Sequence, residues 1–374
     1  MNIGILSMQR VKNWGSFLQA FALKRVIESL GHDCSFLDIK PHVGMTQKEI
    51  SHSHRQLFLH KASAPLRALA HVYRGTFRNR LRTVAFQKKF ESKYNDVFLP
   101  MLGISPQIFS YDKPFDIVVI GSDEVFNCTQ QTSWGKTLYL FGEEVSAKKI
   151  ISFAASFGHT DLAALESCGL VDRLKQALDN FADLSVRDRN SHDLVVHLTG
   201  RVPKILVDPV LIYDFDSYMP AIPPAKDYII IYSYPGRISD PEVVQAIRDY
   251  AKKKNKTIVS LFGYYRWADK SIIAESPFEL LSFFKNSDFV ITDTFHGAVL
   301  AIKYRKNFCV FVRESNRQKL GFLLSQVALS SRTVDKGVDI QRVLDQEIDY
   351  NNTNSILEAE KKRAYAYLQE ALRL

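Results

Sequence analysis

Hydrophobic and polar positions along this chain follow two recurring patterns: short apolar runs and longer stretches with helical spacing. Asn2–Ser7 is an apolar run, and Ser35–Ile39 is another. Between them, Gly15–Leu30 places apolar side chains at three- and four-residue steps and stops at Gly31, a residue typical of helix C-terminal ends. This order of strand, helix and strand predicts a βαβ unit at the start of the chain.

The same alternation of strands and helices resumes after residue 114. The predicted strands are Phe115–Ile120, Lys149–Ala154, Leu184–Val186, Lys204–Val207, Tyr228–Ser233, Thr257–Phe262, Phe289–Thr292 and Phe308–Val312. The predicted helices are Leu162–Ala182 with a break near Gly169, Asn190–Leu198, Pro241–Lys254, Pro277–Lys285, Phe295–Tyr304, Arg317–Ala328 and Ile356–Leu374. Several of the strands are continuously apolar, which is typical of parallel strands buried on both faces.

The length of 374 residues and a Pro- and Tyr-rich bridge at Asp208–Lys226 divide the chain in two, at roughly 150 residues per domain. The expected fold class is α/β, with two Rossmann-like lobes facing across a cleft. We expect an N-terminal lobe at 1–210, with a basic helical insertion at about 41–100. A C-terminal lobe at 211–345 and a final helix at 346–374 would follow.

The insertion carries the net charge of the chain, which is +9. Residues 48–93 contain eleven basic and two acidic residues, an excess that equals the whole net charge. A long helix is predicted at Ala64–Tyr94. Its apolar stripe is Leu66, Leu69, Tyr73, Phe77, Leu81 and Val84, and its arginine stripe is Arg67, Arg74, Arg78 and Arg82. The helix is then either a solvated helix packed on the first lobe or a surface for anionic lipid. Nucleic acid is not favoured, since no helix-turn-helix, RRM or zinc pattern is present.

Composition and segment lengths narrow the class of protein. Hydrophobic residues make up 46% and charged residues 24%, which is ordinary for a globular enzyme. The apolar runs are far shorter than the roughly 20 residues of a spanning helix, and the first residues lack the pattern of a signal peptide. Four scattered cysteines without a CxxC pair favour a reduced, cytoplasmic protein without a metal. His52 and His54 form the only close histidine pair, and a solvated linker explains them better than a metal site.

Side chains that follow the strands of the first half include several candidates for chemistry, because ligands bind beyond the carboxyl ends of parallel strands. Asn13 lies in the loop after the first strand, which is either a binding loop or a plain connection. Asp123 and Glu124 follow the Phe115–Ile120 run, where a carboxylate can orient or deprotonate a sugar hydroxyl; the alternative is that Ser122 or Asp123 caps a helix. Arg187 and Arg189 suit a phosphate or carboxylate, or a surface ion-pair network.

The second half contains the sharpest signal. A buried strand runs into Thr292, Asp293 and Thr294, and a helix then begins with His296 in its first turn. A helix N-terminus attracts anions, and a histidine beside a bound anion has a pKa near neutral pH, as a general acid requires. Arg313, Arg317 and Lys319 follow the next strand as a basic cluster. The chain has no GxGxxG or GxxxxGK[ST] segment, so NAD and P-loop nucleotide sites are not favoured.

Taken in order, these segments resemble the polysaccharide pyruvyl transferase family over roughly residues 1–335. The matching segments are Asn13–Gln19, Gly121–Asn127, Lys149–Gly158, Ser185–Arg189, Val207–Pro209, Thr292–Gly297, and Arg317 ahead of Phe322–Leu324. The resemblance implies a two-lobed, GT-B-like glycosyltransferase fold. It also implies phosphoenolpyruvate (PEP) as the donor and a saccharide acceptor, often linked to polyprenyl diphosphate, in the biosynthesis of surface polysaccharides such as capsule or exopolysaccharide. The product would be a pyruvate ketal, with no further cofactor.

By the same resemblance, His296 is the histidine used for catalysis or PEP binding, and Arg187 and Arg317 are candidate anion ligands. Some members carry an arginine two residues before the histidine, where this chain has Thr294. Arg313, Arg317 and Lys319 are the candidates to replace that contact. Asp123 or Glu124 would serve the acceptor hydroxyls. Two alternatives stay open: a glycosyltransferase that uses a nucleotide sugar on the same fold, and a non-enzymatic scaffold at the inner face of the membrane.

Overall fold

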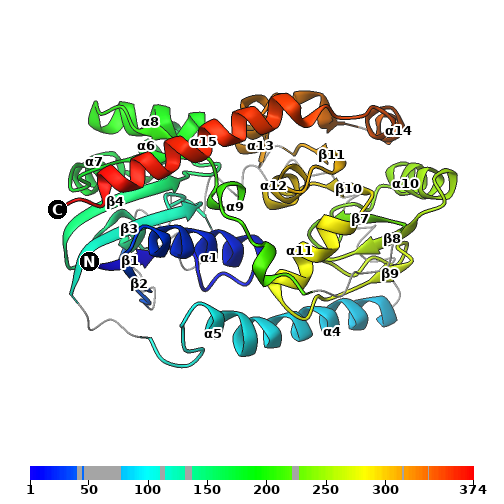
Figure 1. Cartoon of the computed structure of the whole chain (residues 1–374), viewed down its shortest axis with the longest axis horizontal. Coiled ribbons are helices and arrows are strands. Elements are labelled where there is room, and N and C mark those ends of the chain that lie inside the picture. The colour runs from blue at the N-terminus through cyan, green and yellow to red at the C-terminus, as the bar shows by residue number, and fades with distance from the viewer. Residues whose placement is uncertain are drawn as a thin grey trace. The chain divides into compact units, whose positions relative to one another are not determined.

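The chain divides into two compact units, each built around its own sheet. A computed structural model describes residues 1–39, 44–45, 77–109, 114–130, 137–220, 227–313, 316–335 and 337–374. Unit 1 comprises Met1–Gly75, Leu99–Pro209 and Glu360–Leu374, and unit 2 comprises Thr76–Phe98 and Val210–Ala359. Figure 1 shows helices on both faces of the sheet in each unit. The C-terminal helix α15 (Tyr350–Ala371) contributes its first residues to unit 2 and the rest to unit 1.

The sheet of unit 1 is parallel and has six strands in the described residues. In their order across the sheet they are β2 (Asp33–Phe36), β1 (Asn2–Leu6), β3 (Phe115–Asp123), β4 (Ala147–Ala155), β5 (Ser185–Val186) and β6 (Lys204–Ile205). The register pairs Ile5 with Val119, and Val119 with Ile151, so these apolar side chains point to the same face. The predicted strands of the first half are thus confirmed, with shifts of a few residues at their ends.

Helices cover both faces of this sheet. Their bounds are α1 (Trp14–Ser29), α5 (Leu99–Met101), α6 (Leu162–Cys168), α7 (Val171–Asp179) and α8 (Arg189–Thr199). Leu6, Val118 and Ile120 share a buried cluster with residues of α6, α7 and α8. Tyr367 of α15 contacts Phe153 of β4, whose side chain points to the other face. The predicted break of the helix at Gly169 is confirmed, since Gly169 ends α6 in the left-handed conformation that favours glycine.

Unit 2 repeats this architecture. In their order across its parallel sheet, the strands are β12 (Thr333–Val334), β11 (Asn307–Phe311), β10 (Phe289–Thr292), β7 (Tyr228–Tyr232), β8 (Thr257–Ser260) and β9 (Lys270–Ser271). The helices are α4 (Phe77–Lys93), the π-helix η1 (Tyr94–Phe98), α9 (Pro209–Ile212, which begins in unit 1), α10 (Pro241–Lys253), α11 (Pro277–Asn286), α12 (Phe295–Lys303), α13 (Arg317–Gln326) and α14 (Val338–Asp345). The remaining short segments are 3-10 turns at Tyr139–Phe141, Asp216–Tyr218 and Ser330–Arg332.

Local sequence explains where the helices of unit 2 begin. Asp240 accepts hydrogen bonds from two backbone N–H groups of α10, and the Ser276 hydroxyl accepts one from the Glu279 backbone N–H of α11. In both helices a proline occupies the first position, where its missing N–H costs nothing. The core beneath them contains Ile229, Ile247 and Ile291, which are fully buried.

Helix α4 is the described part of the predicted basic helix, and it packs within unit 2. The expectation was a helix on the N-terminal lobe. Instead, Phe90 lies against Phe262, and Arg82 donates to the Tyr264 hydroxyl over 3.1 Å. The predicted apolar stripe differs as well, because Leu81 and Val84 are exposed.

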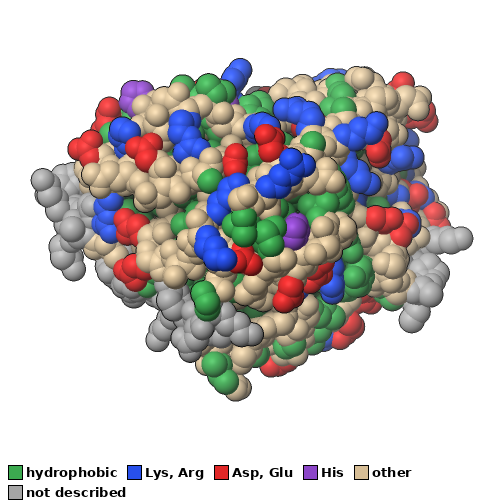
Figure 2. Space-filling view, turned by 60° about the vertical axis from the view of Figure 1, so that its left-hand side comes forward, with side chains coloured by type: hydrophobic (Ala, Val, Ile, Leu, Met, Phe, Trp, Pro, Cys, Tyr) green, Lys and Arg blue, Asp and Glu red, His purple; other side chains and the backbone are tan. Residues whose placement is uncertain are grey.

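The other residues of the predicted stripes lie outside the described part of the chain or have side chains that the structure does not describe. They are Leu66, Arg67, Leu69, Tyr73, Arg74, Phe77 and Arg78. His52 and His54 also lie outside the described residues. On the face shown in Figure 2, basic side chains are interspersed with acidic ones, so that face carries no uniformly positive patch. Within the described ranges, no helix combines the length and apolarity needed to cross a bilayer.

Candidate functional site

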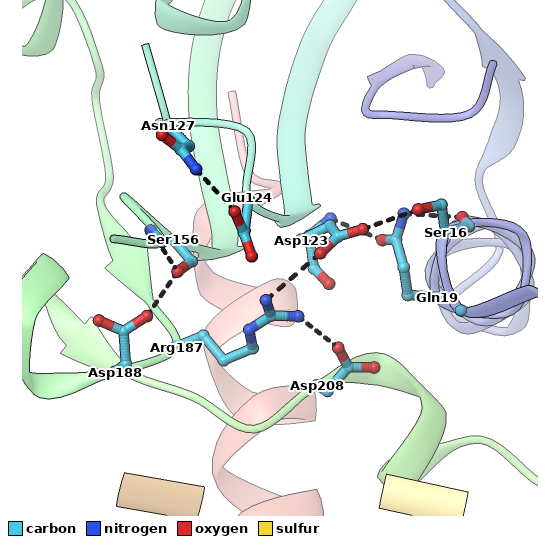
Figure 3. Close-up of polar contacts among 12 residues, drawn as sticks. Ser16, Gln19, Asp123, Glu124, Asn127, Ser156, Arg187, Asp188 and Asp208 are labelled. Atoms are coloured by element: carbon cyan, nitrogen blue, oxygen red, sulfur yellow. Dashed lines mark hydrogen bonds and ion pairs between the residues drawn. The ribbon is translucent and has the colours of Figure 1, made fainter. Parts of the chain in front are cut away.

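The carboxyl edge of the unit 1 sheet gathers several predicted side chains around one arginine (Figure 3). Asp123 ends β3, Arg187 follows β5, and Asp208 follows β6. The Arg187 guanidinium donates to Asp208 Oδ2 over 2.7 Å and to Asp123 Oδ1 over 3.4 Å. Arg187 therefore bridges two carboxylates that come from different strands of the sheet.

Burial and charge explain why this arginine is held in place. The side chains of Arg187 and Asp208 are 3% and 0% exposed. Burial alone would lower the pKa of Arg187, but the nearby carboxylates of Asp208 and Asp123 raise it above its usual value. Asp188 and Glu124 act in the same direction. The cluster contains more carboxylates than cations, which disfavours a further anion and suits hydroxyl groups, because a carboxylate only accepts hydrogen bonds.

A buried network of hydrogen bonds fixes the Asp123 side chain and the end of β3. The Ser16 hydroxyl donates to Asp123 Oδ2 over 2.9 Å, and Gln19 accepts a hydrogen bond from the Ser122 backbone N–H over 3.0 Å. Both Ser16 and Gln19 belong to α1, so the helix positions the end of β3. Gly121 makes this close packing possible, since a Cβ there would lie 2.1 Å from the Phe153 carbonyl oxygen.

Glu124 lies at the same edge of the sheet with its own partners. Asn127 Nδ2 donates to Glu124 Oε2 over 2.6 Å, and the same amide nitrogen lies 3.3 Å from His159 Nδ1. Asp188 has a structural task nearby, because it caps α8 and accepts a hydrogen bond from the Ser156 hydroxyl over 2.6 Å. Asp123 and Glu124 thus lie together at the strand end, as predicted, and neither caps a helix.

Two other predicted residues of unit 1 have described contacts outside this cluster. Asn13 caps α1, since its side chain accepts a hydrogen bond from the Gly15 backbone N–H over 2.8 Å. Arg189 has a 64% exposed side chain that lies 4.0 Å from Asp193. These contacts match the alternatives considered for each residue, a connection that starts a helix and a surface ion pair. A binding role for either residue stays a prediction.

In unit 2, the segment Thr292–Gly297 turns from β10 into α12. Thr294 caps the helix through a 3.0 Å hydrogen bond from the Gly297 backbone N–H. The Thr292 hydroxyl donates to the Tyr232 carbonyl over 2.6 Å. A Cβ on Gly297 would lie 2.1 Å from Thr292 Oγ1, so only glycine fits there. His296 occupies the first turn of α12 and is 8% exposed.

Asp293 of this segment pairs with two arginines. Arg313 Nε donates to Asp293 Oδ2 over 2.6 Å, and Arg237 Nη1 lies 3.7 Å from the same oxygen. The Asp293 side chain is fully buried, whereas each arginine side chain is 38% exposed. The Asn316 side chain fixes the turn by donating to the Asp293 carbonyl over 2.7 Å. The predicted residues Asp293 and Arg313 are therefore in direct contact.

The other members of the predicted basic cluster lie on α13. Arg317 is exposed at the first position of this helix, and Lys319, two residues further on, is half-buried. The structure therefore joins Arg313, but not this pair, to Asp293 by a described contact. Among the described residues, no group of three His, Cys, Asp or Glu side chains could hold a metal ion.

Three residues of these clusters were missed by the sequence analysis as site residues: Arg237, Asp208 and His159. Arg237 follows β7 in a tight turn with Gly236 in a left-handed conformation. Its position in the turn after the apolar strand β7 was the signal that could have identified it. Asp208 was assigned to the interdomain bridge and to the matching segment Val207–Pro209, without a role at the site. His159 follows β4, and its position after that strand was the signal.

Comparison with known proteins identifies the family and the fold. Residues 13–315 match the family model described as polysaccharide pyruvyl transferase. The structure is similar to a protein described as a UDP-N-acetylglucosamine 2-epimerase from Listeria monocytogenes, with 10% identity, a TM-score of 0.52, and coverage of 99% of this chain and 95% of that one. The α/β fold with two parallel six-stranded sheets is thus the GT-B type of glycosyltransferases and epimerases.

Two further solved structures are more distant. MnaA of Staphylococcus aureus, solved with UDP, is 13% identical with a TM-score of 0.46 and covers 99% of this chain and 90% of that one. An α,α-trehalose 6-phosphate synthase from Burkholderia multivorans is 10% identical with a TM-score of 0.47, covering 99% and 96%. Comparison with curated proteins gave no match.

Proposed function

Because the chain belongs to the polysaccharide pyruvyl transferase family, we propose that it transfers pyruvate from PEP to two hydroxyls of a saccharide. In this reaction a proton adds to the methylene carbon of PEP, and C2 becomes an oxocarbenium-like centre. One sugar hydroxyl adds to C2 and phosphate leaves. The second hydroxyl then closes the ketal, and the two hydroxyl protons balance the new methyl C–H bond and the released phosphate.

The observation that supports this proposal most is the position of His296. It lies in the first turn of α12, directly after the strand β10, in a segment that matches the family motif. The N-terminal end of a helix carries partial positive charge, which attracts the anionic groups of PEP. An imidazole at this place is suited to supply the proton for the methylene carbon.

The unit 1 cluster is suited to the acceptor. Asp123 is fixed by the Ser16 hydroxyl and Arg187, and Glu124 is fixed by Asn127. Carboxylate oxygens accept hydrogen bonds, so both side chains are suited to bind a donating sugar hydroxyl. We propose that Arg187 orients Asp123 through its ion pair. Direct contact of Arg187 with the donor stays a prediction, since it would have to exchange Asp208 for the anion.

Helix α4 offers a means of delivery to a lipid-linked acceptor. Its outward surface combines the exposed apolar side chains Leu81 and Val84 with the exposed cations Lys88 and Lys89. Anionic lipid headgroups attract such cations, and apolar side chains enter the interface beside them. We propose peripheral attachment to the cytoplasmic face of a membrane through this helix.

Ligand-induced stabilisation tests the donor. PEP at 100 times its dissociation constant should add about 2.7 kcal/mol to the free energy of unfolding. A nucleotide sugar such as UDP-N-acetylglucosamine serves as the comparison ligand. Stabilisation by PEP alone supports the pyruvyl transferase. Stabilisation by the nucleotide sugar alone would reject it in favour of a glycosyltransferase on the same fold, and stabilisation by neither would fit a scaffold.

A further inference from the structure

Three neighbouring strands of unit 2 end in a carboxylate between two arginines. Asp293 follows β10, Arg237 follows β7 on one side, and Arg313 follows β11 on the other. Arg313 also donates through Nη2 to the Arg237 backbone carbonyl over 2.6 Å. The two arginines are therefore tied to each other as well as to Asp293.

The charges of this group do not balance. Asp293 contributes one negative charge and the two guanidinium groups contribute two positive ones, because arginine stays protonated in proteins. The Asp293 carboxylate is fully buried, whereas each arginine side chain is partly exposed to solvent. Asp293 can therefore fix the two arginines while part of each side chain stays accessible to a ligand. A guanidinium has five N–H donors, and the described contacts of Arg237 and Arg313 use only some of them.

Two further contacts indicate that the group is preorganised. The Arg237 guanidinium stacks over the Tyr234 ring at 4.3 Å from its centroid, which restricts the side chain. Asp293 Oδ1 is buried and has no hydrogen-bond partner among the described residues. A buried oxygen without a hydrogen-bond partner lowers stability, so stability alone does not explain the arrangement.

We infer that Arg237 and Arg313 form an anion-binding pair for the carboxylate or phosphate of the donor, with Asp293 as their positioning residue. This inference rests on the proposed function for the identity of the donor. Guanidinium groups bind such anions through two parallel hydrogen bonds, and two fixed arginines offer more than one such face. Arg237 would then supply positive charge next to Asp293, in the segment that also carries His296.

Binding measurements test the pair without requiring turnover. We would titrate PEP, and separately inorganic phosphate, into the wild type and into Arg237→Gln, with calorimetric detection. Loss of a charge-assisted contact of about 1.5–3 kcal/mol weakens binding by about tenfold or more. Arg237→Lys should fall between the two, because charge remains but the fork is lost. Arg248→Gln, which removes an exposed arginine from α10, should change neither affinity.

The outcomes separate this inference from the proposed function. PEP binding that is unchanged in Arg237→Gln overturns the inference and leaves the pyruvyl transferase standing. Phosphate binding that depends on Arg237, in a wild type that does not bind PEP, supports the anion pair and counts against PEP as the donor. If the wild type binds neither ligand, the pair is not an anion site. Should Arg237→Gln fail to fold, Arg237→Lys replaces it in the same titrations, with a smaller expected loss of affinity.

The role of Asp293 requires a double-mutant cycle on phosphate affinity. Asp293→Asn should weaken binding, and adding it to Arg313→Gln should cost less than the two single losses together, because Asp293 acts mainly through its 2.6 Å contact with Arg313. A side chain that only stabilises the fold would instead leave the affinity of the folded fraction unchanged. Losses that add up in the double variant would also reject the positioning role.

Discussion

The carboxyl edges of the two sheets hold opposite arrangements of the same two kinds of side chain. In unit 1, the buried Arg187 lies between the carboxylates of Asp123 and Asp208. In unit 2, the buried Asp293 lies between the guanidinium groups of Arg237 and Arg313. Each central charge is buried and needs a partner, because an unpaired charge inside a protein is very costly. The outer partners therefore determine the sign of the charge that each edge presents.

This difference shows how one fold can serve two ligand chemistries. Both edges are built by parallel strands that end side by side. An excess of carboxylates suits neutral polyols, whose hydroxyls donate hydrogen bonds, whereas an excess of guanidinium suits carboxylates and phosphates. The proposal that the saccharide binds at unit 1 and PEP at unit 2 rests on this contrast. Variants at either edge, and on α4, should therefore have separable effects.

The largest effect is expected at His296, on which the assignment of the chemistry to unit 2 depends. His296→Ala should lower PEP-dependent ketal formation about 10²–10⁴-fold, since general acids contribute that much. His197→Ala, an exposed position on α8 of unit 1, is the matched control and should be active. More than about a tenth of the wild-type rate in folded His296→Ala would contradict a general-acid role.

The second prediction concerns the centre of the unit 1 cluster. Arg187→Ala leaves the buried Asp208 without its counter-charge and should lower the free energy of unfolding by about 3–5 kcal/mol in denaturant titrations. Arg189→Ala, two residues away and exposed, should change it by less than about 0.5 kcal/mol.

Adding Asp208→Asn to Arg187→Ala should recover part of the loss, because the uncompensated charge is removed. An Arg187→Ala protein as stable as Arg189→Ala would show that the pair does not hold the cluster together. Suppose that Arg187→Ala is as stable as the wild type but needs a much higher PEP concentration for activity. Arg187 would then contact the donor, and the two units would not bind different ligands.

The third prediction is that the cations of α4 act in lipid binding and not in PEP binding. Lys88→Gln with Lys89→Gln should weaken binding to anionic phospholipid vesicles roughly tenfold or more, at about 1 kcal/mol for each cation near the surface. Binding of the wild type should also decline with salt. PEP affinity should not change. Lys252→Gln with Lys253→Gln removes two exposed charges from α10 and should bind vesicles as the wild type does. If both double variants bind vesicles equally well, α4 does not bind the membrane and is a solvated helix.

The smallest expected effect is the pH dependence of the contact between α4 and the rest of unit 2. A hydrogen bond from Lys93 lowers the pKa of Glu275. The ionised carboxylate is therefore favoured in the folded state, and its stabilisation is present above the unfolded pKa of about 4.3 and lost as the pH falls.

Because Glu275 is largely exposed, this contribution is at most about 0.2–1 kcal/mol. Glu275→Gln should lower the free energy of unfolding at pH 7 by that amount and leave it nearly unchanged at pH 3. Glu242→Gln, an exposed glutamate of α10, is the control. A loss that is equal at both pH values would exclude the ion pair as its cause.

Much of the fold follows from local pattern. Continuous apolar runs such as Tyr228–Tyr232 leave little alternative to a buried parallel strand, and caps such as Asp240 and Ser276 fix helix starts to the residue. Strand ends also located Asp123 and Arg187 at the carboxyl edge of the first sheet, and Asp293 at the carboxyl edge of the second.

What the pattern could not supply is which of these side chains pair with one another. The Arg187 guanidinium could bind a phosphate, and only the tertiary structure shows that it donates to the Asp208 carboxylate instead. The same limit applies to α4, whose apolar positions suggested Leu81 and Val84 as packing residues. Its actual contact depends on the Phe262 surface, which lies far away in the sequence. Pairing of distant residues is a property of the tertiary structure and leaves no periodic trace.

The discontinuous make-up of unit 1 sets an order of assembly during protein synthesis. A ribosome adds about 5–20 residues per second from the N-terminus, and domains usually complete in that order. Unit 2 has all its segments once Ala359 is made, whereas unit 1 still lacks Glu360–Leu374. In that segment the Tyr367 hydroxyl donates to the Ser152 carbonyl over 2.7 Å, and Leu368 and Leu372 are buried. The unit that begins first on the ribosome is therefore finished last, and a nascent chain stalled before Glu360 would present an incomplete first unit to chaperones and proteases.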